Sequence, residues 1–171
     1  MSSAETVKKF NKLKEKLNEQ GLDFILTGEL VLYLFYGLDR EVSEINLVVT
    51  DKDEVNGVVN ELGYSDCVEV NELKFLDYYD LVGDLKVDKP EVLAMEVRKG
   101  QLNLKKLYDL VFLANHPEFN VDLSDLFRYS LNPNVIDYLI STQGSSLSDD
   151  NIKYLMINLS KSMQDLGYLV K

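Results

Sequence analysis

Polar residues stand at two predicted strand ends, and their spacing suits the binding of a phosphorylated nucleotide against a metal. The apolar run 24–27 leads into Gly28, which opens a predicted helix. Such a turn points backbone N–H groups at an anion, and phosphate fits there well. Glu44 and Asn46 open the next predicted strand two residues apart, so their side chains share one face. We therefore expect the Gly28 turn and this polar pair to meet at one site.

The hydrophobic pattern places this site in an α/β half that precedes an all-helical half, which makes the fold class α+β. Ser2 and Glu5 have the spacing of a capping box ahead of an amphipathic helix, and Asp51 and Glu54 form a second capping pair. The elements predicted up to residue 100 are a helix over 4–20, a strand over 24–27, a helix over 30–36, a strand over 45–50, a helix from Asp51 to Gly63, a hairpin of strands 68–70 and 73–79 around Asn71-Glu72, a short strand over 85–87 and a helix over 90–98.

From residue 104 onward the pattern is helical. It predicts helices around 107–114, 123–127 and 135–140, and a last helix from Ser148 or Asp149 that could close the core or form a dimer seam. We expect an α/β core over 1–100 and a helical part over 101–171 that packs on the same core. Each part alone would be small for an independent domain.

Composition excludes several classes of function. The formal net charge of -11 repels nucleic acid and anionic membranes, so we expect no direct binding to either. Cys67 is the only cysteine and His116 the only histidine, which excludes an internal disulfide and a metal site rich in either residue. The first residues form a charged amphipathic helix instead of an apolar leader, which predicts a cytoplasmic protein.

The order of strand, glycine turn, helix, loop and strand resembles the nucleotidyltransferase superfamily. In that superfamily a glycine followed by Gly or Ser ends the first strand, and an acid-x-acid pair opens the next. Those positions hold Gly28-Glu29 and Glu44-Ile45-Asn46 here. The likeness is closer to small bacterial members, including the AbiEii toxin group. It extends over about residues 22–114 and also rests on Tyr36-Gly37, Arg40, Ser43, Pro90-Glu91-Val92-Leu93-Ala94-Met95 and Lys105-Lys106-Leu107-Tyr108-Asp109-Leu110.

The resemblance implies a mixed sheet flanked by helices, with a helical C-terminal part. It also implies that carboxylates hold Mg²⁺, which prefers hard oxygen ligands and would activate a hydroxyl toward a nucleoside triphosphate. Glu44 and Asn46 would be catalytic metal ligands, with Asp80 as the third and Asp77 as its alternative. The implied substrate-binding residues are Gly28, Glu29, Arg40 and Ser43.

Two of these positions depart from the superfamily pattern. Glu29 stands where a small residue lets phosphate approach, although an acidic residue also stabilises the first turn of any helix. Asn46 stands where a carboxylate would bind metal, and it could instead cap a strand together with Glu44. Arg40 could bind phosphate or form a salt bridge with Asp39 or Glu44.

The substitutions favour a protein of this fold that has lost catalysis and serves as a binding or regulatory module with a protein partner. Under the alternative, it is an active Mg²⁺-dependent enzyme that moves a nucleoside monophosphate from a triphosphate to a hydroxyl. A toxin that acts on one specific target is a further interpretation. In the inactive case no cofactor is expected.

Overall fold

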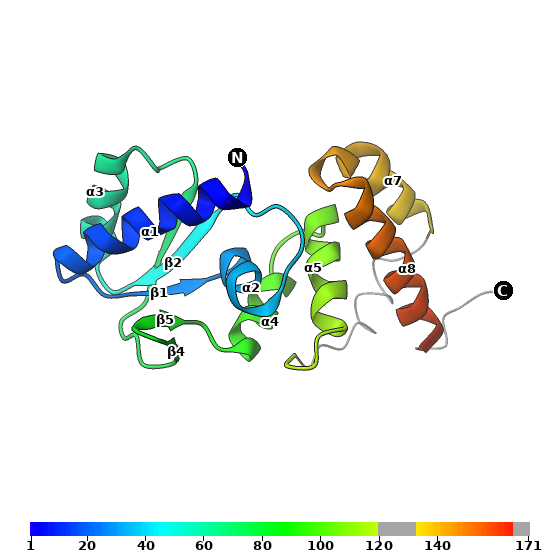
Figure 1. The fold of residues 1–171 in the computed structure, drawn as a ribbon. Coiled ribbons are helices and arrows are strands. Elements are labelled where there is room, and N and C mark those ends of the chain that lie inside the picture. Colours follow the sequence, from blue (N-terminus) through cyan, green and yellow to red (C-terminus); the bar gives the residue numbers. More distant parts are fainter. Residues whose placement is uncertain (120–132, 166–171) are drawn as a thin grey trace. The chain divides into compact units, whose positions relative to one another are not determined.

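The computed structural model describes residues 1–119 and 133–165, which fall into two compact units, Met1–Lys89 and Pro90–Lys171 (Figure 1). Helix α4, which the sequence analysis assigns to the α/β half, belongs to the second unit in this division. The common core of the two parts stays a prediction. Within the described residues, no helix is both long and apolar enough to cross a membrane.

The first unit is an α+β structure built on a mixed five-stranded sheet. Its elements are α1 (Ser3–Glu19), β1 (Phe24–Thr27), α2 (Glu29–Tyr36), β2 (Ile45–Val49), α3 (Lys52–Leu62), β3 (Val68–Glu72), β4 (Asp80–Val82) and β5 (Leu85–Val87). The strand order is β3-β2-β1-β5-β4, with β1 antiparallel to β2 and parallel to β5. α1 packs against α3, α3 against β3, and α2 against β1 and β2.

Local signals placed most of these elements correctly. All four residues of β1 are buried, as expected of a central strand with an apolar run. The Ser2 hydroxyl accepts a hydrogen bond from the Glu5 N–H at 3.2 Å, and the Asp51 carboxylate accepts one from the Glu54 N–H at 3.1 Å. Both predicted N-caps are therefore confirmed.

The predicted hairpin between 68–70 and 73–79 is wrong. β3 continues through Asn71 and Glu72 and pairs in parallel with β2, where these two residues lie opposite Val48 and Val49. Residues 73–79 form no strand, and the hairpin of this unit joins β4 to β5 instead. Asn71 and Glu72, whose polar side chains suggested a turn, are instead exposed residues of an edge strand, because β3 is at one end of the strand order.

The described part of the second unit is helical, as predicted. It contains α4 (Pro90–Arg98), α5 (Leu104–Ala114), α7 (Pro133–Gln143), the short 3₁₀ helix η1 (Gly144–Ser146) and α8 (Asp149–Asp165). The helix predicted around 123–127 lies outside the described residues. A buried hydrogen bond from Asn151 Nδ2 to the Tyr108 hydroxyl, 3.2 Å long, joins α8 to α5.

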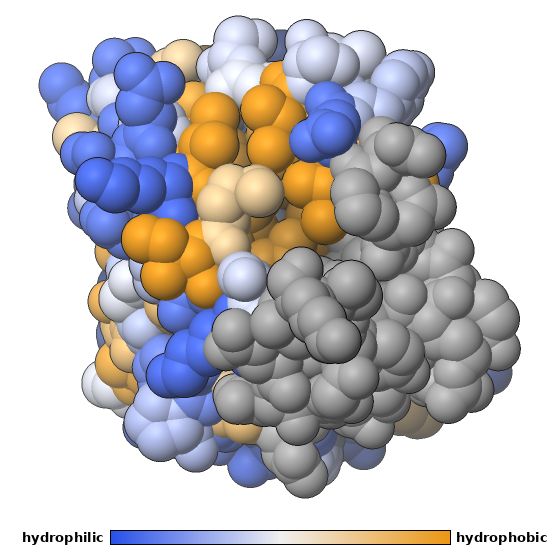
Figure 2. Space-filling model, turned by 90° about the vertical axis from the view of Figure 1, so that its right-hand side faces the viewer, coloured by the Kyte–Doolittle hydropathy of each residue, from blue (hydrophilic) through white to orange (hydrophobic). Residues whose placement is uncertain are grey.

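The last helix contributes to the core of its unit and also exposes apolar side chains. Leu155 and Leu159 are buried, whereas Met156 and Ile157 are 40% and 60% exposed. On the face shown in Figure 2, hydrophobic side chains form a strip flanked by hydrophilic ones. α8 thus closes a core, and the dimer seam stays a prediction.

Candidate functional site

Gly28 and Asn46 lie in direct contact at one end of the sheet. β1 and β2 are antiparallel with Thr27 opposite Asn46, so the residue after Thr27 meets the head of β2. Gly28 caps α2 with φ of 78° and ψ of -156°, a conformation that essentially only glycine adopts. A Cβ on residue 28 would lie 2.7 Å from Asn46 Nδ2. The structure therefore brings the glycine turn and the second residue of the polar pair together, with the amide filling the space beside Gly28.

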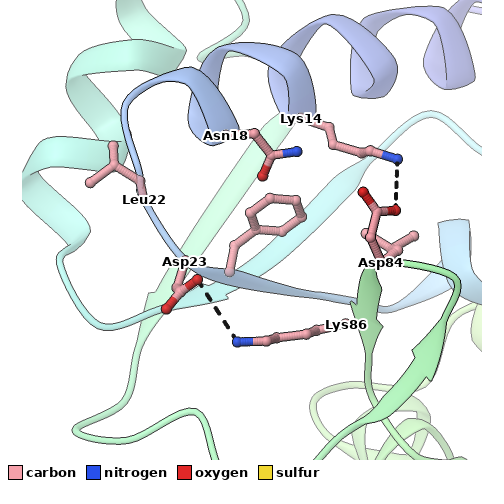
Figure 3. A pocket seen from close by; sticks show the side chains of 8 residues that line it. Lys14, Asn18, Leu22, Asp23, Asp84 and Lys86 are labelled. Carbon is pink, nitrogen blue, oxygen red and sulfur yellow. Dashed lines mark ion pairs between the residues drawn. The ribbon is translucent and has the colours of Figure 1, made fainter.

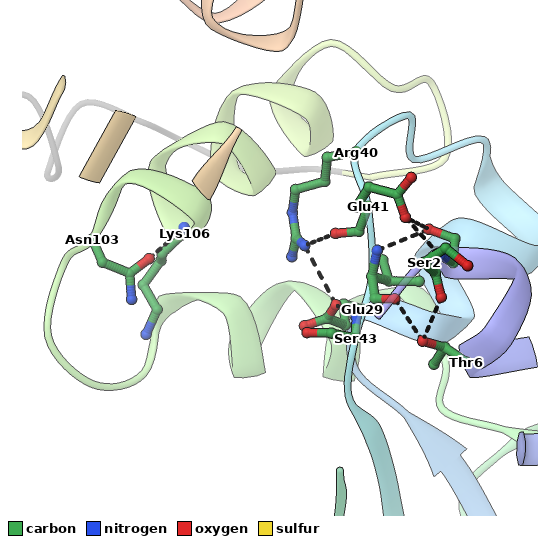
Figure 4. Close-up of polar contacts among 10 residues, drawn as sticks. Ser2, Thr6, Glu29, Arg40, Glu41, Ser43, Asn103 and Lys106 are labelled. Atoms are coloured by element: carbon green, nitrogen blue, oxygen red, sulfur yellow. Dashed lines mark hydrogen bonds and ion pairs between the residues drawn. The ribbon is translucent and has the colours of Figure 1, made fainter. Parts of the chain in front are cut away.

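Glu29 binds the loop between α2 and β2 (Figure 4). Its Oε2 accepts a hydrogen bond from the Ser43 backbone N–H at 3.0 Å and lies 3.4 Å from Arg40 Nη1. The side chains of Glu29 and Arg40 are only 14% and 3% exposed, so the ion pair is largely withdrawn from water. An internal carboxylate thus binds two groups, Arg40 and the Ser43 backbone, that the sequence analysis assigned to substrate.

The same loop is tied to the first turn of α1. Arg40 Nη1 donates to the Glu41 carbonyl at 2.9 Å, and the Glu41 carboxylate accepts from the Ser3 N–H and hydroxyl. The buried Thr6 hydroxyl donates to the Val42 carbonyl at 2.8 Å. Figure 4 shows both sets of contacts converging on residues 40–43. Arg40 and Ser43 therefore stand on a segment held from two sides, by α1 and by α2.

Asp80 is not brought to Asn46. β1 and β5 stand between β2 and β4, and three strand spacings amount to roughly 14 Å. Asp80 instead accepts a hydrogen bond from Lys89 Nζ at 2.8 Å. The alternative, Asp77, lies exposed in the connection before β4. Glu44 precedes β2 as an exposed residue at the same sheet end as Gly28.

Sequence reasoning missed Asp88, a carboxylate that lies closer to the glycine turn. It follows β5 directly, and its backbone N–H donates to the Leu26 carbonyl at 3.0 Å. Since β5 is parallel to β1 and adjacent to it, Asp88 lies one strand from Thr27 at the same sheet end. Its side chain is buried. The usable signal was an acidic residue directly after the short strand at 85–87.

Thr27 adds a buried polar atom at this end of the sheet. Its residue is 6% exposed, and its Oγ1 has no hydrogen-bond partner. Most buried polar atoms are hydrogen-bonded, so this hydroxyl is an exception within the described chain. It lies on the strand position that faces Asn46 across the β1–β2 pair.

The donor set predicted for Mg²⁺ does not fit that ion. Mg²⁺ is bound at 2.0–2.1 Å and needs its carboxylates close together. Asn46 contributes a neutral amide, and Asp80 lies several strands away, bound to Lys89. Across residues 1–119 and 133–165, no three His, Cys, Asp or Glu side chains gather so as to hold a metal ion. We derive no chemical step through a metal at this site.

A small hollow at the opposite end of β1 is separate from this site (Figure 3). It is lined by Lys14, Asn18, Leu22, Asp23, Phe24, Asp84, Leu85 and Lys86. Lys14 pairs with Asp84 and Lys86 with Asp23, each at 3.8 Å. Because each lysine is matched by an aspartate, the hollow has no excess charge that would attract an ion.

Two solved structures from Helicobacter pylori are similar to this chain over nearly its whole length. One, described as a candidate nucleotidyltransferase, has a TM-score of 0.61 at 18% identity, and the match covers 99% of this chain and 98% of the chain in that structure. The other, JHP933, has a TM-score of 0.60 at 19% identity, and the match covers 95% of this chain and 94% of the JHP933 chain. At such identities the likeness shows the fold alone. The chain thus has a nucleotidyltransferase-like fold.

No protein-family profile matches the sequence, and no curated protein is significantly similar to it.

Proposed function

We propose that this chain is a nucleotidyltransferase-fold protein with an impaired catalytic site that acts as a binding or regulatory module. The observation that carries the proposal is the contact of Glu29 with Arg40 and the Ser43 N–H. A substrate phosphate would have to displace this carboxylate. Separating one partner from a buried ion pair costs about 3–5 kcal/mol, which corresponds to roughly two to four orders of magnitude in affinity.

Asn46 supports the same proposal from the metal side. Its amide is neutral and packs over Gly28. In the superfamily pattern, the residue at position 46 would be a carboxylate. A single neutral oxygen binds Mg²⁺ weakly compared with a carboxylate. The missing metal ligand at position 46 and the binding of Arg40 and the Ser43 N–H by Glu29 both act against nucleotidyl transfer. We therefore expect the ligand of this protein to be a protein partner.

Asp88 favours the alternative, an active Mg²⁺-dependent nucleotidyltransferase. This buried carboxylate lies at the sheet end that also carries Glu44 and Asn46. Under this alternative these three residues, with Asp88 in place of Asp80, would supply the oxygen ligands. Membership of the AbiEii group and toxin activity would follow only if this enzyme acts on a cellular target, and growth arrest on expression is the measurement for that.

Thermal unfolding with Mg²⁺ and each of the four nucleoside triphosphates tests the proposal. A ligand present at a hundred times its Kd adds about 2.7 kcal/mol of stability. We expect no shift for the natural chain and a nucleotide-dependent shift for the Glu29→Ser, Asn46→Asp double variant. Asp53→Ser is the matched control, since it removes an exposed first-turn acid from α3.

The alternative makes the opposite prediction. A saturable shift of the natural chain, or transfer of a labelled monophosphate from triphosphate to an acceptor by the natural chain, contradicts the impaired site. Loss of that transfer in Asp88→Asn would then identify the third carboxylate.

A further inference from the structure

Helix α8 exposes a row of apolar and charged side chains in the second unit. Met156 and Ile157, near the middle of the helix, are 40% and 60% exposed. Asp150, Lys153 and Lys161 are also exposed. Positions 150, 153, 157 and 161 recur every three or four residues, so they lie along one side of the helix, with position 156 beside them. We call these five residues the α8 surface.

The charged side chains of the α8 surface are not used within the chain. Among the described residues, the ion pairs include none of Asp150, Lys153 and Lys161. The exposed Asp149 stands next to Asp150 in the first turn. Two acids and one lysine leave the N-terminal end of the row negative, whereas Lys161 makes the other end positive. The row is therefore neutral as a whole, and its two ends have opposite charge.

This charge distribution selects an antiparallel second copy of the chain as the partner. Asp150 and Lys161 lie six and five residues from Met156, or roughly 8–9 Å along the helix. A twofold axis beside Met156 would therefore set Asp150 of each copy next to Lys161 of the other and bring the exposed apolar side chains together. A parallel arrangement would instead place like charges side by side, which electrostatic complementarity disfavours.

The size of the α8 surface and the charge of the chain set the expected strength of this contact. Each copy carries a formal net charge of -11, but exposed charges are screened beyond about 8 Å at physiological ionic strength. Repulsion thus comes mainly from groups near the contact, where the described charges balance. One helix face is small beside the roughly 800 Å² that each partner buries in a stable complex. We therefore expect a weak dimer whose population rises with protein concentration.

We propose that the α8 surface binds the α8 surface of a second copy of this chain in antiparallel orientation. Met156 and Ile157 form the apolar centre of the contact, and Asp150 pairs with Lys161 of the other copy at both ends. This inference goes beyond the proposed function. It holds whether or not the glycine turn binds nucleotide, because α8 and that turn belong to different units.

Sedimentation velocity of the full chain, from low micromolar to near-millimolar concentration at physiological ionic strength, measures the dimer. Ile157→Ser should weaken dimerisation about tenfold for each copy, and so about a hundredfold in all, because it removes apolar area from both halves of the contact. Met95→Ser is the matched control, since Met95 is 54% exposed on α4 of the same unit. This control should dimerise as the natural chain does.

Charge reversal tests the orientation of the two helices. Asp150→Lys and Lys161→Glu should each weaken the dimer, because each change places like charges together at both ends of the contact. A mixture of the two variants should dimerise again, since one copy then offers an acid and the other a base at each end. Circular dichroism checks that the variants keep their helices. Should a charge variant fail to fold, the comparison of Ile157→Ser with Met95→Ser decides.

Three results overturn the proposal. The first is a natural chain that stays monomeric up to near-millimolar concentration, since the α8 surface would then be left to a different protein. The second is a dimer that Ile157→Ser leaves unchanged or that Met95→Ser weakens equally. The third is a mixture of folded Asp150→Lys and Lys161→Glu chains that associates no better than either variant alone.

Discussion

The side chain of Asn46 packs against Gly28 so closely that no Cβ fits between them. A Cβ on residue 28 would approach Asn46 Nδ2 to 2.7 Å and Asn46 Cβ to 3.3 Å. The antiparallel pairing of Thr27 with Asn46 fixes this contact, because it sets the glycine turn beside the start of β2. The residue in the position of a metal ligand is thus also a packing partner of the turn.

Gly28→Ala should destabilise the chain strongly. The alanine would adopt a backbone conformation reserved for glycine and would collide with Asn46. Gly37→Ala is the matched control, because Gly37 has φ of 82° but open space around it. We expect Gly28→Ala to lower the free energy of unfolding by about 1–3 kcal/mol more than Gly37→Ala, as for overpacking. Urea unfolding measures both.

An Asn46→Ala background checks the origin of that difference. Part of the penalty of Gly28→Ala should disappear there, since the colliding amide is gone. Equal penalties in both backgrounds would assign the whole effect to the backbone of residue 28.

Glu29→Ala should destabilise the chain by about 2–4 kcal/mol, because it leaves the buried Arg40 guanidinium without this carboxylate. Glu29→Gln should cost less, since its amide oxygen can still accept from the Ser43 N–H. Glu96→Ala breaks an exposed pair with Lys99 and should stay within about 0.5 kcal/mol. A Glu29→Ala variant as stable as Glu96→Ala in urea unfolding would show that the loop does not depend on this contact.

Thr27→Val and Thr6→Val should have opposite effects on stability. The Thr27 hydroxyl is buried without a hydrogen-bond partner, so its removal should stabilise the chain by about 1 kcal/mol. The Thr6 hydroxyl donates to the Val42 carbonyl and also lies 3.1 Å from the Ser2 carbonyl. Its removal should cost about 1–3 kcal/mol. Calorimetry on both variants gives the comparison, and a destabilising Thr27→Val would reveal a partner for that hydroxyl.

Cys67 should link stability to alkaline pH. Burial raises the pKa of the Cys67 thiol, nearby Lys9 lowers it, and Asp66 raises it, with burial the largest influence. The unfolded thiol ionises near pH 8.5, while the folded thiol still holds its proton. Stability from this group is therefore complete below about pH 8.5 and is lost as the pH rises through the folded pKa.

Urea unfolding between pH 7 and pH 10 measures this dependence, with Cys67→Ala as the control. In this control the free energy of unfolding should fall less at alkaline pH, because no thiol ionises at position 67. Alkylation of the natural chain at pH 8 should also be slower than that of free cysteine and should accelerate in urea. Identical pH profiles for both proteins would contradict the link.

The neighbours of each acidic residue could not be read from the sequence. The resemblance assigns the third carboxylate to Asp80, with Asp77 as the alternative. In the structure β4 is an edge strand, and β5 stands beside β1 with Asp88 after it. Strand order depends on contacts between distant segments, which no local pattern contains.

The binding partners of the Glu29 side chain could not be predicted from the sequence either. The residue type alone was consistent with a stabilised first helical turn or with repulsion of phosphate. Its carboxylate in fact binds Arg40 and the backbone of Ser43, 11 and 14 residues away. The local helix could be predicted from sequence, whereas the partner of the side chain depended on the path of the loop.

The sequence by itself determined the caps of α1 and α3, the buried strand β1 and the glycine turn, since these depend on side-chain spacing and on backbone preferences of a few consecutive residues. Only the tertiary structure decided that Asn46 covers Gly28, that Glu29 holds Arg40, and that Asp88 lies nearer than Asp80 to the turn. Those relationships follow from strand order, register and loop path, which arise when distant segments pack together.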